Sequence, residues 1–196
     1  MYMFGGTAIG LATKNGVILA ADRRFTYENL IIATGVRKIF MITDYACLAA
    51  AGLVSDFQQL VRDISYIVRI REIELGRRVP IKSIAKLVSL LLYNNKLYPL
   101  LTQVLIGGYV DKPTLISLDP LGSLIEDKYV AVGSGAEIAI GILDSSYSDD
   151  LSIEDGRKIV IESFNAVTKR DALSGKEIDI AVIRQNGYGI DTVVLG

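Results

Sequence analysis

The sequence predicts an α+β fold, a four-layer αββα sandwich in which two antiparallel sheets pack face to face between two outer pairs of helices. The first indication is the order of the expected elements: strands, two helices, strands, two helices and again strands. A second indication is that residues 17–21 are apolar on both faces of a strand, and such a strand needs cover on both sides. A second sheet on one face and helices on the other supply that cover.

The first half of the chain is expected to form five strands and then the first helix pair. The strands are residues 7–12, 17–21, 30–33, 36–43 and 46–51. Asn15 and Gly16 join the first two strands in a tight hairpin, with the positive φ angles of a type I′ turn. Apolar residues at three- and four-residue spacing then predict a helix that is capped by Ser55 and ends near Gly76, and a second helix that opens at Pro80.

The second half is expected to repeat this order and to close with a hairpin. The strands are residues 103–107, 114–119, 129–132, 178–184 and 188–194. Two helices lie between the strands over residues 129–132 and 178–184, one over residues 136–143 and a long one that begins near Ser152. Asn186 and Gly187 mark the turn of the closing hairpin. No linker, repeat or low-complexity segment interrupts the pattern, which indicates one domain.

Composition excludes several classes of function. The formal net charge is −1, so no broad basic field attracts nucleic acid, and no apolar run approaches the roughly 20 residues of a membrane span. The chain has no histidine, which excludes Ser-His-Asp and Cys-His catalysis and His-ligated zinc, and we expect neither a metal nor a cofactor. The lone Cys47 lies in an apolar run and is expected to be a buried thiol in a reducing cytoplasm.

The hydrophobic content is high for a chain without a membrane span. Of the 196 residues 51% are hydrophobic, and the mean hydropathy is +0.38. A thick core would explain this, but burial against partner subunits explains it better, because oligomer interfaces resemble cores.

Five short motifs occur in order along the chain. They are Ala21-Asp22-Arg23-Arg24, Arg37-Lys38-Ile39-Phe40, Ala51-Gly52-Leu53-Val54-Ser55-Asp56, Val132-Gly133-Ser134-Gly135 and Lys169-Arg170-Asp171-Ala172-Leu173-Ser174-Gly175. Each motif alone is weak. Together, at this spacing, they resemble the β subunits of archaeal-type 20S proteasomes, which belong to the N-terminal nucleophile hydrolases, from Ile9 to Ser174. The resemblance implies the αββα fold, in agreement with the order of elements.

The resemblance also implies a role for each candidate site residue. In that family the nucleophile is the hydroxyl of an N-terminal threonine and its own α-amine is the base, so no histidine is needed. By resemblance Lys38 favours the developing alkoxide, Asp22 holds that lysine, and the Gly52 N–H stabilises the oxyanion. The residues that match the group orienting the amine and a nearby water are Ser134, Asp171 and Ser174. The specificity-pocket positions are Phe25, Val36, Ala50 and Val54, which carry no charge and imply a preference for apolar residues.

The same residues permit a plainer interpretation. Asp22 and Lys38 could be an ordinary ion pair between strands, and Ser134 could cap a helix after a glycine-rich turn. Asp171 and Ser174 could simply end the long helix. The five motifs in order favour the catalytic constellation over these alternatives.

The chain departs from the family pattern at its start. Aligning Gly10, Asp22 and Lys38 with the family places Gly6 at the nucleophile position, and glycine has no hydroxyl. Cleavage before Thr7 would create an N-terminal threonine, but successive side chains on a strand point to opposite faces, so this hydroxyl would face the wrong way. We therefore expect a non-catalytic or unprocessed subunit, and an active threonine endopeptidase with Thr7 as nucleophile is the alternative.

The resemblance further implies the partners and the organisation of the chain. Residues 1–6 would be a propeptide-like segment and residues 7–196 a single β-type domain. The partners would be α subunits, other β subunits in a ring, unfolded polypeptide substrates and a regulatory ATPase acting through the α ring, in the cytoplasm and without nucleic acid or membrane.

Two other members of the superfamily fit the sequence less well. An α-ring subunit carries a helix before its first strand, whereas the first strand here is expected to start at about Thr7. A bacterial HslV-type peptidase, which forms six-membered rings, is disfavoured because the second helix pair and residues 108–120 look more like the archaeal β type.

Overall fold

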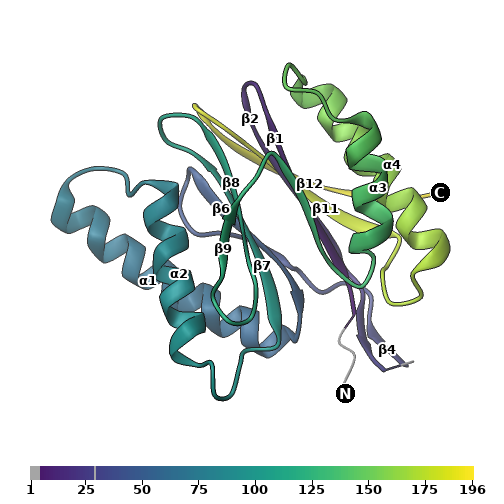
Figure 1. The fold of residues 1–196 in the computed structure, drawn as a ribbon, viewed down its shortest axis with the longest axis horizontal. Coiled ribbons are helices and arrows are strands. Elements are labelled where there is room, and N and C mark those ends of the chain that lie inside the picture. Colours follow the sequence, from purple (N-terminus) through teal and green to yellow (C-terminus); the bar gives the residue numbers. More distant parts are fainter. Residues whose placement is uncertain (1–4, 29) are drawn as a thin grey trace.

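The computed structural model describes residues 5–28 and 30–196 and has four layers (Figure 1). One helix pair covers one main sheet, the other pair covers the second sheet, and the two sheets face each other in the middle. The helices are α1 (Val54–Leu75), α2 (Ile81–Asn94), α3 (Ala136–Ser146) and α4 (Ile153–Arg170). The predicted αββα sandwich is confirmed.

Both main sheets are antiparallel and five-stranded. The first has the order β10-β1-β2-β11-β12, with β10 (Tyr129–Gly133), β1 (Thr7–Thr13), β2 (Gly16–Asp22), β11 (Glu177–Arg184) and β12 (Gly187–Val194). The second has the order β5-β6-β7-β8-β9, with β5 (Ile39–Met41), β6 (Ala46–Gly52), β7 (Thr102–Tyr109), β8 (Pro113–Leu118) and β9 (Leu124–Glu126). A separate two-stranded sheet pairs β3 (Phe25–Tyr27) with β4 (Leu30–Ala33).

Three apolar clusters hold the layers together. One lies between the two sheets and includes Leu19 of β2, Ala49 of β6 and Leu105 of β7. The second lies beneath α1 and α2, and the third beneath α3 and α4. Strand β2 is buried at every residue, as its two apolar faces predict, because one face contacts the other sheet and the opposite face contacts the α3–α4 layer.

The first hairpin differs from the predicted type I′ turn. Thr13 pairs with Gly16, so the two loop residues are Lys14 and Asn15. Neither Asn15 nor Gly16 is among the residues with a positive φ. Gly16 serves close packing instead, because a Cβ at this position would lie 2.4 Å from the Ile183 carbonyl oxygen.

Helix α1 begins differently from the prediction and ends as predicted. Its N-cap residue is Leu53, which has no side-chain oxygen to cap with, so the prediction of Ser55 was wrong; Ser55 donates to Asp56 Oδ1 over 3.2 Å instead. Gly76 ends the helix with φ +63°. The three-residue strands β3 and β9 were missed and the strand predicted over 36–43 is shorter, because segments of that length carry little periodic signal.

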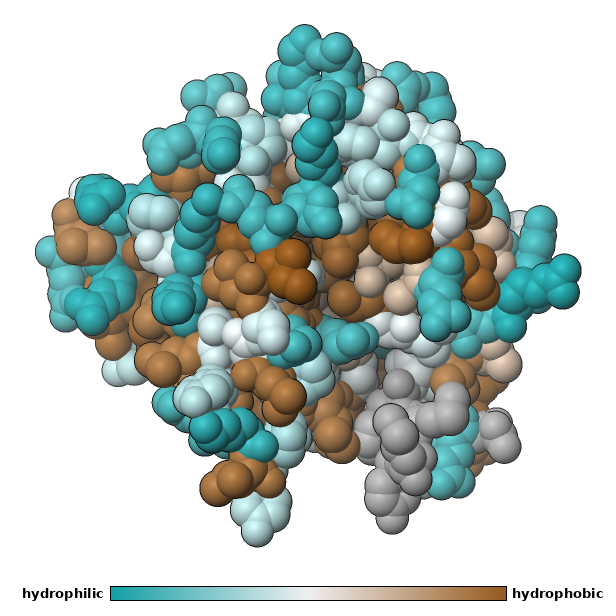
Figure 2. Space-filling model, in the orientation of Figure 1, coloured by the Kyte–Doolittle hydropathy of each residue, from teal (hydrophilic) through white to brown (hydrophobic). Residues whose placement is uncertain are grey.

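Large apolar side chains reach the surface on the α1–α2 side of the molecule, where apolar atoms interrupt the hydrophilic surface (Figure 2). Three of them follow one another at four- and three-residue spacing on α1: Tyr66, Ile70 and Ile73 are 70%, 38% and 75% exposed. We call these three residues the α1 stripe. Among residues 5–28 and 30–196, no helix is long and apolar enough to cross a membrane.

Cys47 is expected to be unreactive in the folded chain. It lies fully buried in β6, and burial raises the pKa of its thiol to about 12. A thiol reagent at about pH 8 should not modify the native chain, whereas the chain in denaturant should react at once, because the thiol then returns to its ordinary pKa of about 8.5. An absorbance assay of thiol modification makes the measurement. Rapid reaction of the native chain would contradict the buried position.

Candidate active site

The candidate site lies at the start of β1 and is centred on a buried ion pair. Lys38 Nζ donates to Asp22 Oδ1 over 2.9 Å, and the two side chains are 1% and 0% exposed. The carboxylate also accepts hydrogen bonds from the backbone N–H groups of Thr7 (2.8 Å), Arg24 (2.8 Å) and Gly175 (2.9 Å). These donors satisfy the buried carboxylate, and without them burial of the charge would be strongly unfavourable.

Gly6 lies directly in front of this ion pair. A Cβ built on Gly6 would lie 2.2 Å from Lys38 Nζ and 3.0 Å from Asp22 Oδ1. Residue 6 is therefore the position whose side chain would meet the buried ammonium. Its φ of +118° lies in the region that favours glycine.

The backbone of Gly6 is held by a second polar group. Its N–H donates to Ser134 Oγ over 3.2 Å, and its carbonyl accepts from the Ser134 N–H over 3.0 Å. The hydroxyls of Ser134 and Ser174 both donate to Asp171 Oδ2, over 2.7 Å and 2.6 Å. Two hydroxyls and one carboxylate thus form a chain of hydrogen bonds that reaches the nitrogen of residue 6.

Thr7 is fully buried and its hydroxyl is already engaged. The Gly135 N–H donates to Thr7 Oγ1 over 2.9 Å, and Thr7 Oγ1 lies 2.8 Å from Ser174 Oγ. Because the single Ser174 hydrogen goes to Asp171, the Thr7 hydroxyl is the donor to Ser174. The Thr7 hydroxyl therefore joins β1 to the start of α3 and to Ser174, whereas Lys38 faces residue 6.

The structure brings six of the predicted site residues into one hydrogen-bonded cluster. They are Thr7, Asp22, Lys38, Ser134, Asp171 and Ser174. The structure also bears on the plainer interpretations of Ser134 as a helix cap and of Asp171 as the end of a helix. Ser134 is not a helix cap, since Gly135 is the N-cap residue of α3 and no side chain caps that helix. Asp171 is the C-cap residue of α4, and its side chain belongs to the cluster as well.

Gly52 lies at the end of β6, near residue 6. Its φ is +130°, and a Cβ there would lie 2.2 Å from the Leu101 carbonyl oxygen, so only glycine fits. A Cβ built on Gly133 would lie 2.0 Å from the Gly6 carbonyl oxygen and 2.8 Å from Ala51 Cβ. This packing places the end of β6 beside residue 6, and the oxyanion role of Gly52 stays a prediction.

The four predicted pocket residues do not share one environment. Phe25 and Val36 are half-buried. Ala50 is fully buried in the apolar cluster beneath α1 and α2, and Val54 packs against that cluster. Their role as a specificity pocket stays a prediction.

Sequence reasoning missed the backbone donors of the cluster. The N–H groups of Gly135 and Gly175 bind the Thr7 hydroxyl and the Asp22 carboxylate. Close approach explains the glycine at 135, because a Cβ there would lie 2.5 Å from Thr7 Oγ1. Both glycines stand in the quoted motifs, but a backbone N–H has no side-chain signature that would have singled it out.

The fold places two sheets between two helix pairs, and an ammonium, a carboxylate and hydroxyl groups meet at the start of its first strand. This arrangement is that of the N-terminal nucleophile hydrolase folds. The family model described as "Proteasome subunit" matches residues 3–183. The chain therefore belongs to the proteasome subunit family, and within it to the archaeal-type β subunits.

Named relatives cover nearly the whole chain. It is 44% identical to "Proteasome subunit beta 1" of Ignicoccus hospitalis, over 93% of this chain and 92% of the relative. It is 44% identical to "Proteasome subunit beta 1" of Desulfurococcus amylolyticus, over 93% and 91%. It is 40% identical to "Proteasome subunit beta 2" of Pyrobaculum calidifontis, over 97% and 95%.

Proposed function

We propose that this chain is a non-catalytic member of the β ring of a 20S proteasome core particle. The observation that carries the proposal is the environment of residue 6. Lys38 and Asp22 are directed at the position where the family has its nucleophile, and that position is a glycine. The chain thus has the orienting groups of an N-terminal threonine hydrolase around a residue that has no hydroxyl to activate.

The alternative is an active subunit in which cleavage before Thr7 exposes the nucleophile. Thr7 favours it in one respect, since its hydroxyl belongs to the same hydrogen-bonded cluster. Three contacts oppose it: the Thr7 hydroxyl is bound by Ser174 and by the Gly135 N–H, and the Thr7 N–H is bound by Asp22. A displacement of a reacting group by about 1 Å can cost about a hundredfold in rate.

The proposed partners are α subunits and other β subunits that carry the threonine. A regulatory ATPase would act through the α ring and deliver unfolded polypeptides, and the particle would work in the cytoplasm. The exposed α1 stripe supports assembly with partner subunits, because large apolar residues in a row on an outer helix are unfavourable in water.

Co-expression with α subunits and an active β subunit tests the proposal. We expect this chain to enter a high-mass particle in size-exclusion chromatography with light scattering. Intact mass spectrometry should show that it keeps the residues before Thr7. A stable monomer that ignores α and other β chains, or a chain that starts at Thr7, would contradict the proposal.

Replacing Ile73 by lysine is expected to block assembly and leave the fold intact. Ile73 is 75% exposed, so the change should alter the free energy of unfolding by only about 0.5 kcal/mol. In an interface the ammonium would be buried without a partner, which is strongly unfavourable. Val194→Lys is the matched control, because Val194 is also 75% exposed but lies on β12. Light scattering of the co-expressed particle compares them, and equal effects of the two variants would argue against the α1 stripe as an interface.

A further inference from the structure

The charge of this chain is distributed unevenly. Residues 69–86, which form the end of α1 and the start of α2, contain six cationic residues and two acidic ones, although the whole chain has a net charge of −1. The cations are Arg69, Arg71, Arg77, Arg78, Lys82 and Lys86, and the acids are Glu72 and Glu74. Two of these cations are paired with acids outside the segment, Arg78 with Asp44 over 3.0 Å and Lys82 with Glu126 over 2.6 Å, so the local excess of positive charge comes from the other cations.

Part of this charge surrounds a pocket between the two helices. The pocket has a volume of about 350 Å³, which is within the range of ligand sites. Its cationic lining is Arg71, Arg77 and Lys86, and Leu75, Leu87 and Val79 are among its apolar lining residues. We call this the basic pocket. It joins apolar walls to ammonium and guanidinium groups, so it suits a ligand that has both an apolar body and an anionic group.

The cations of the basic pocket are largely uncompensated. Arg71 is paired with Glu74 over 3.1 Å. Among residues 5–28 and 30–196, the side chains of Arg77 and Lys86 have no hydrogen-bond or ion-pair partner. The other acid of the segment, Glu72, accepts from the Tyr45 hydroxyl over 2.6 Å. Neither acid of the segment forms an ion pair with Arg77 or Lys86.

The start of α2 adds to the preference for an anion. Its N-cap residue is Pro80, no side chain caps the helix, and its first turn contains no acidic residue. Ser83 of that turn lines the basic pocket. The partial positive charge of a helix N-terminus therefore lies beside the cations of the pocket.

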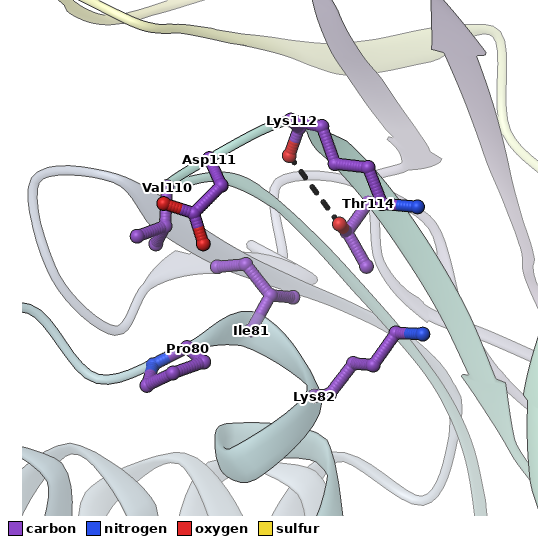
Figure 3. Close-up of a pocket in the computed structure, with 7 residues that line it drawn as sticks. All are labelled: Pro80, Ile81, Lys82, Val110, Asp111, Lys112 and Thr114. Carbon is purple, nitrogen blue, oxygen red and sulfur yellow. Dashed lines mark hydrogen bonds between the residues drawn. The ribbon is translucent and has the colours of Figure 1, made fainter.

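A second hollow, on the other side of Pro80, has a different character. Figure 3 shows it between Ile81 and the β7–β8 turn, where Asp111 supplies a carboxylate; its volume is about 180 Å³. One of its two lysines, Lys82, is paired with Glu126 over 2.6 Å. Acidic groups of the chain itself thus balance this smaller hollow, and the excess of positive charge belongs to the basic pocket.

We propose that the basic pocket binds a segment of a partner protein in which an acidic residue stands next to a bulky apolar one. The carboxylate pairs with Arg77 and Lys86, and the apolar side chain lies against Leu75 and Leu87. A free phosphate would leave the apolar walls uncovered. Nucleic acid fits less well, because no aromatic residue lines the pocket and a base would have nothing to stack on.

The test uses the full chain and a fluorescein-labelled pentapeptide in which three glutamates alternate with two leucines. Its anisotropy should rise on addition of the chain, and binding should weaken at about 0.5 M salt, where charges are screened within a few ångströms. The double variant Arg77→Gln/Lys86→Gln should bind about tenfold more weakly, since it removes two charge-assisted contacts. Both side chains are exposed, so the fold should be retained. The matched control Lys169→Gln/Arg184→Gln removes two exposed cations elsewhere and should bind as the unmodified chain does.

Several outcomes would overturn this proposal. Equal binding by the two double variants would show a non-specific charge effect. If a peptide with glutamine in place of glutamate bound equally tightly, the carboxylates would contribute nothing to binding. Full competition by millimolar inorganic phosphate would indicate a small-anion site instead. A change in the oligomeric state of the purified chain on Arg77→Gln/Lys86→Gln would point to a second copy of this chain as the occupant.

Discussion

Replacing Asp22 by asparagine is expected to lower the free energy of unfolding by about 3–5 kcal/mol. Lys38 is 1% exposed and its ammonium would lose the carboxylate that lies 2.9 Å away. An uncompensated buried charge is more unfavourable than the loss of an ordinary hydrogen bond. In a chain of this length such a change lowers the midpoint of thermal unfolding by about 10 °C, which calorimetry or circular dichroism measures.

The double variant Asp22→Asn/Lys38→Met separates the charge effect from the loss of packing. It removes the stranded ammonium and keeps an unbranched apolar side chain, so it should regain much of the stability lost in Asp22→Asn. The N–H groups of Arg24 and Gly175, which bind Asp22 Oδ2, would still find the side-chain oxygen of asparagine. The Thr7 N–H, which binds Oδ1, would face the amide NH2 group in the single and the double variant alike, so this loss cancels in the comparison. If the double variant were less stable than Asp22→Asn, the ion pair would not be the source of the effect.

The sequence predicted the layers of the fold because they follow from which residues are apolar. Strand β2 is apolar on both faces and is buried on both, and α1 and α2 bury the side of each helix that the apolar spacing selects. Turn and cap details were less predictable. The Asn15-Gly16 pair is typical of a type I′ turn, yet the pairing of Thr13 with Gly16 moves the loop back by one residue. Pairing with neighbouring strands decides such a register, and a dipeptide does not contain it.

The side chains of the site were predictable only through the resemblance of their motifs. Asp22 and Lys38 are 16 residues apart and lie in contact, whereas Gly6 and Ser134 are 128 apart. No local pattern predicts contacts at such separations. The contacts of Thr7 were less predictable still, because one of the two partners of its hydroxyl is a backbone group, the N–H of Gly135.

Replacing Gly6 by threonine is expected to turn a silent subunit into a self-processing peptidase inside an assembled particle. A side chain at residue 6 starts beside Lys38 Nζ, and the nitrogen of residue 6 is already 3.2 Å from Ser134 Oγ. The lysine must shift, which is feasible for the end of an unbranched side chain. Turnover of fluorogenic peptides with apolar residues before the cleaved bond should rise at least about a hundredfold over the unmodified chain. Intact mass spectrometry should show a chain that starts at residue 6.

The backbone geometry adds a second expectation to this variant. Residue 6 has φ +118°, where a residue with a side chain is strained by about 1–3 kcal/mol. The Gly6→Thr change would therefore destabilise the uncut chain, and cleavage before residue 6 would release the strain, because an N-terminal residue has no φ. A Gly6→Thr chain that has been cut should thus unfold at a higher temperature than a Gly6→Ala chain, which has the same strain at residue 6 and stays uncut.

Two further variants decide which residue holds the reactive hydroxyl. Gly6→Ala introduces the same Cβ and the same strain but no hydroxyl, so it should show neither cleavage nor turnover. Thr7→Ala in the unmodified chain tests the alternative nucleophile. The Thr7 hydroxyl is bound by Ser174 and Gly135, so we expect this variant to alter stability and leave the absence of processing unchanged. If instead the unmodified chain starts at Thr7 and cuts peptides, and Thr7→Ala abolishes both, then Thr7 is the nucleophile and the silent subunit proposed above is an active one.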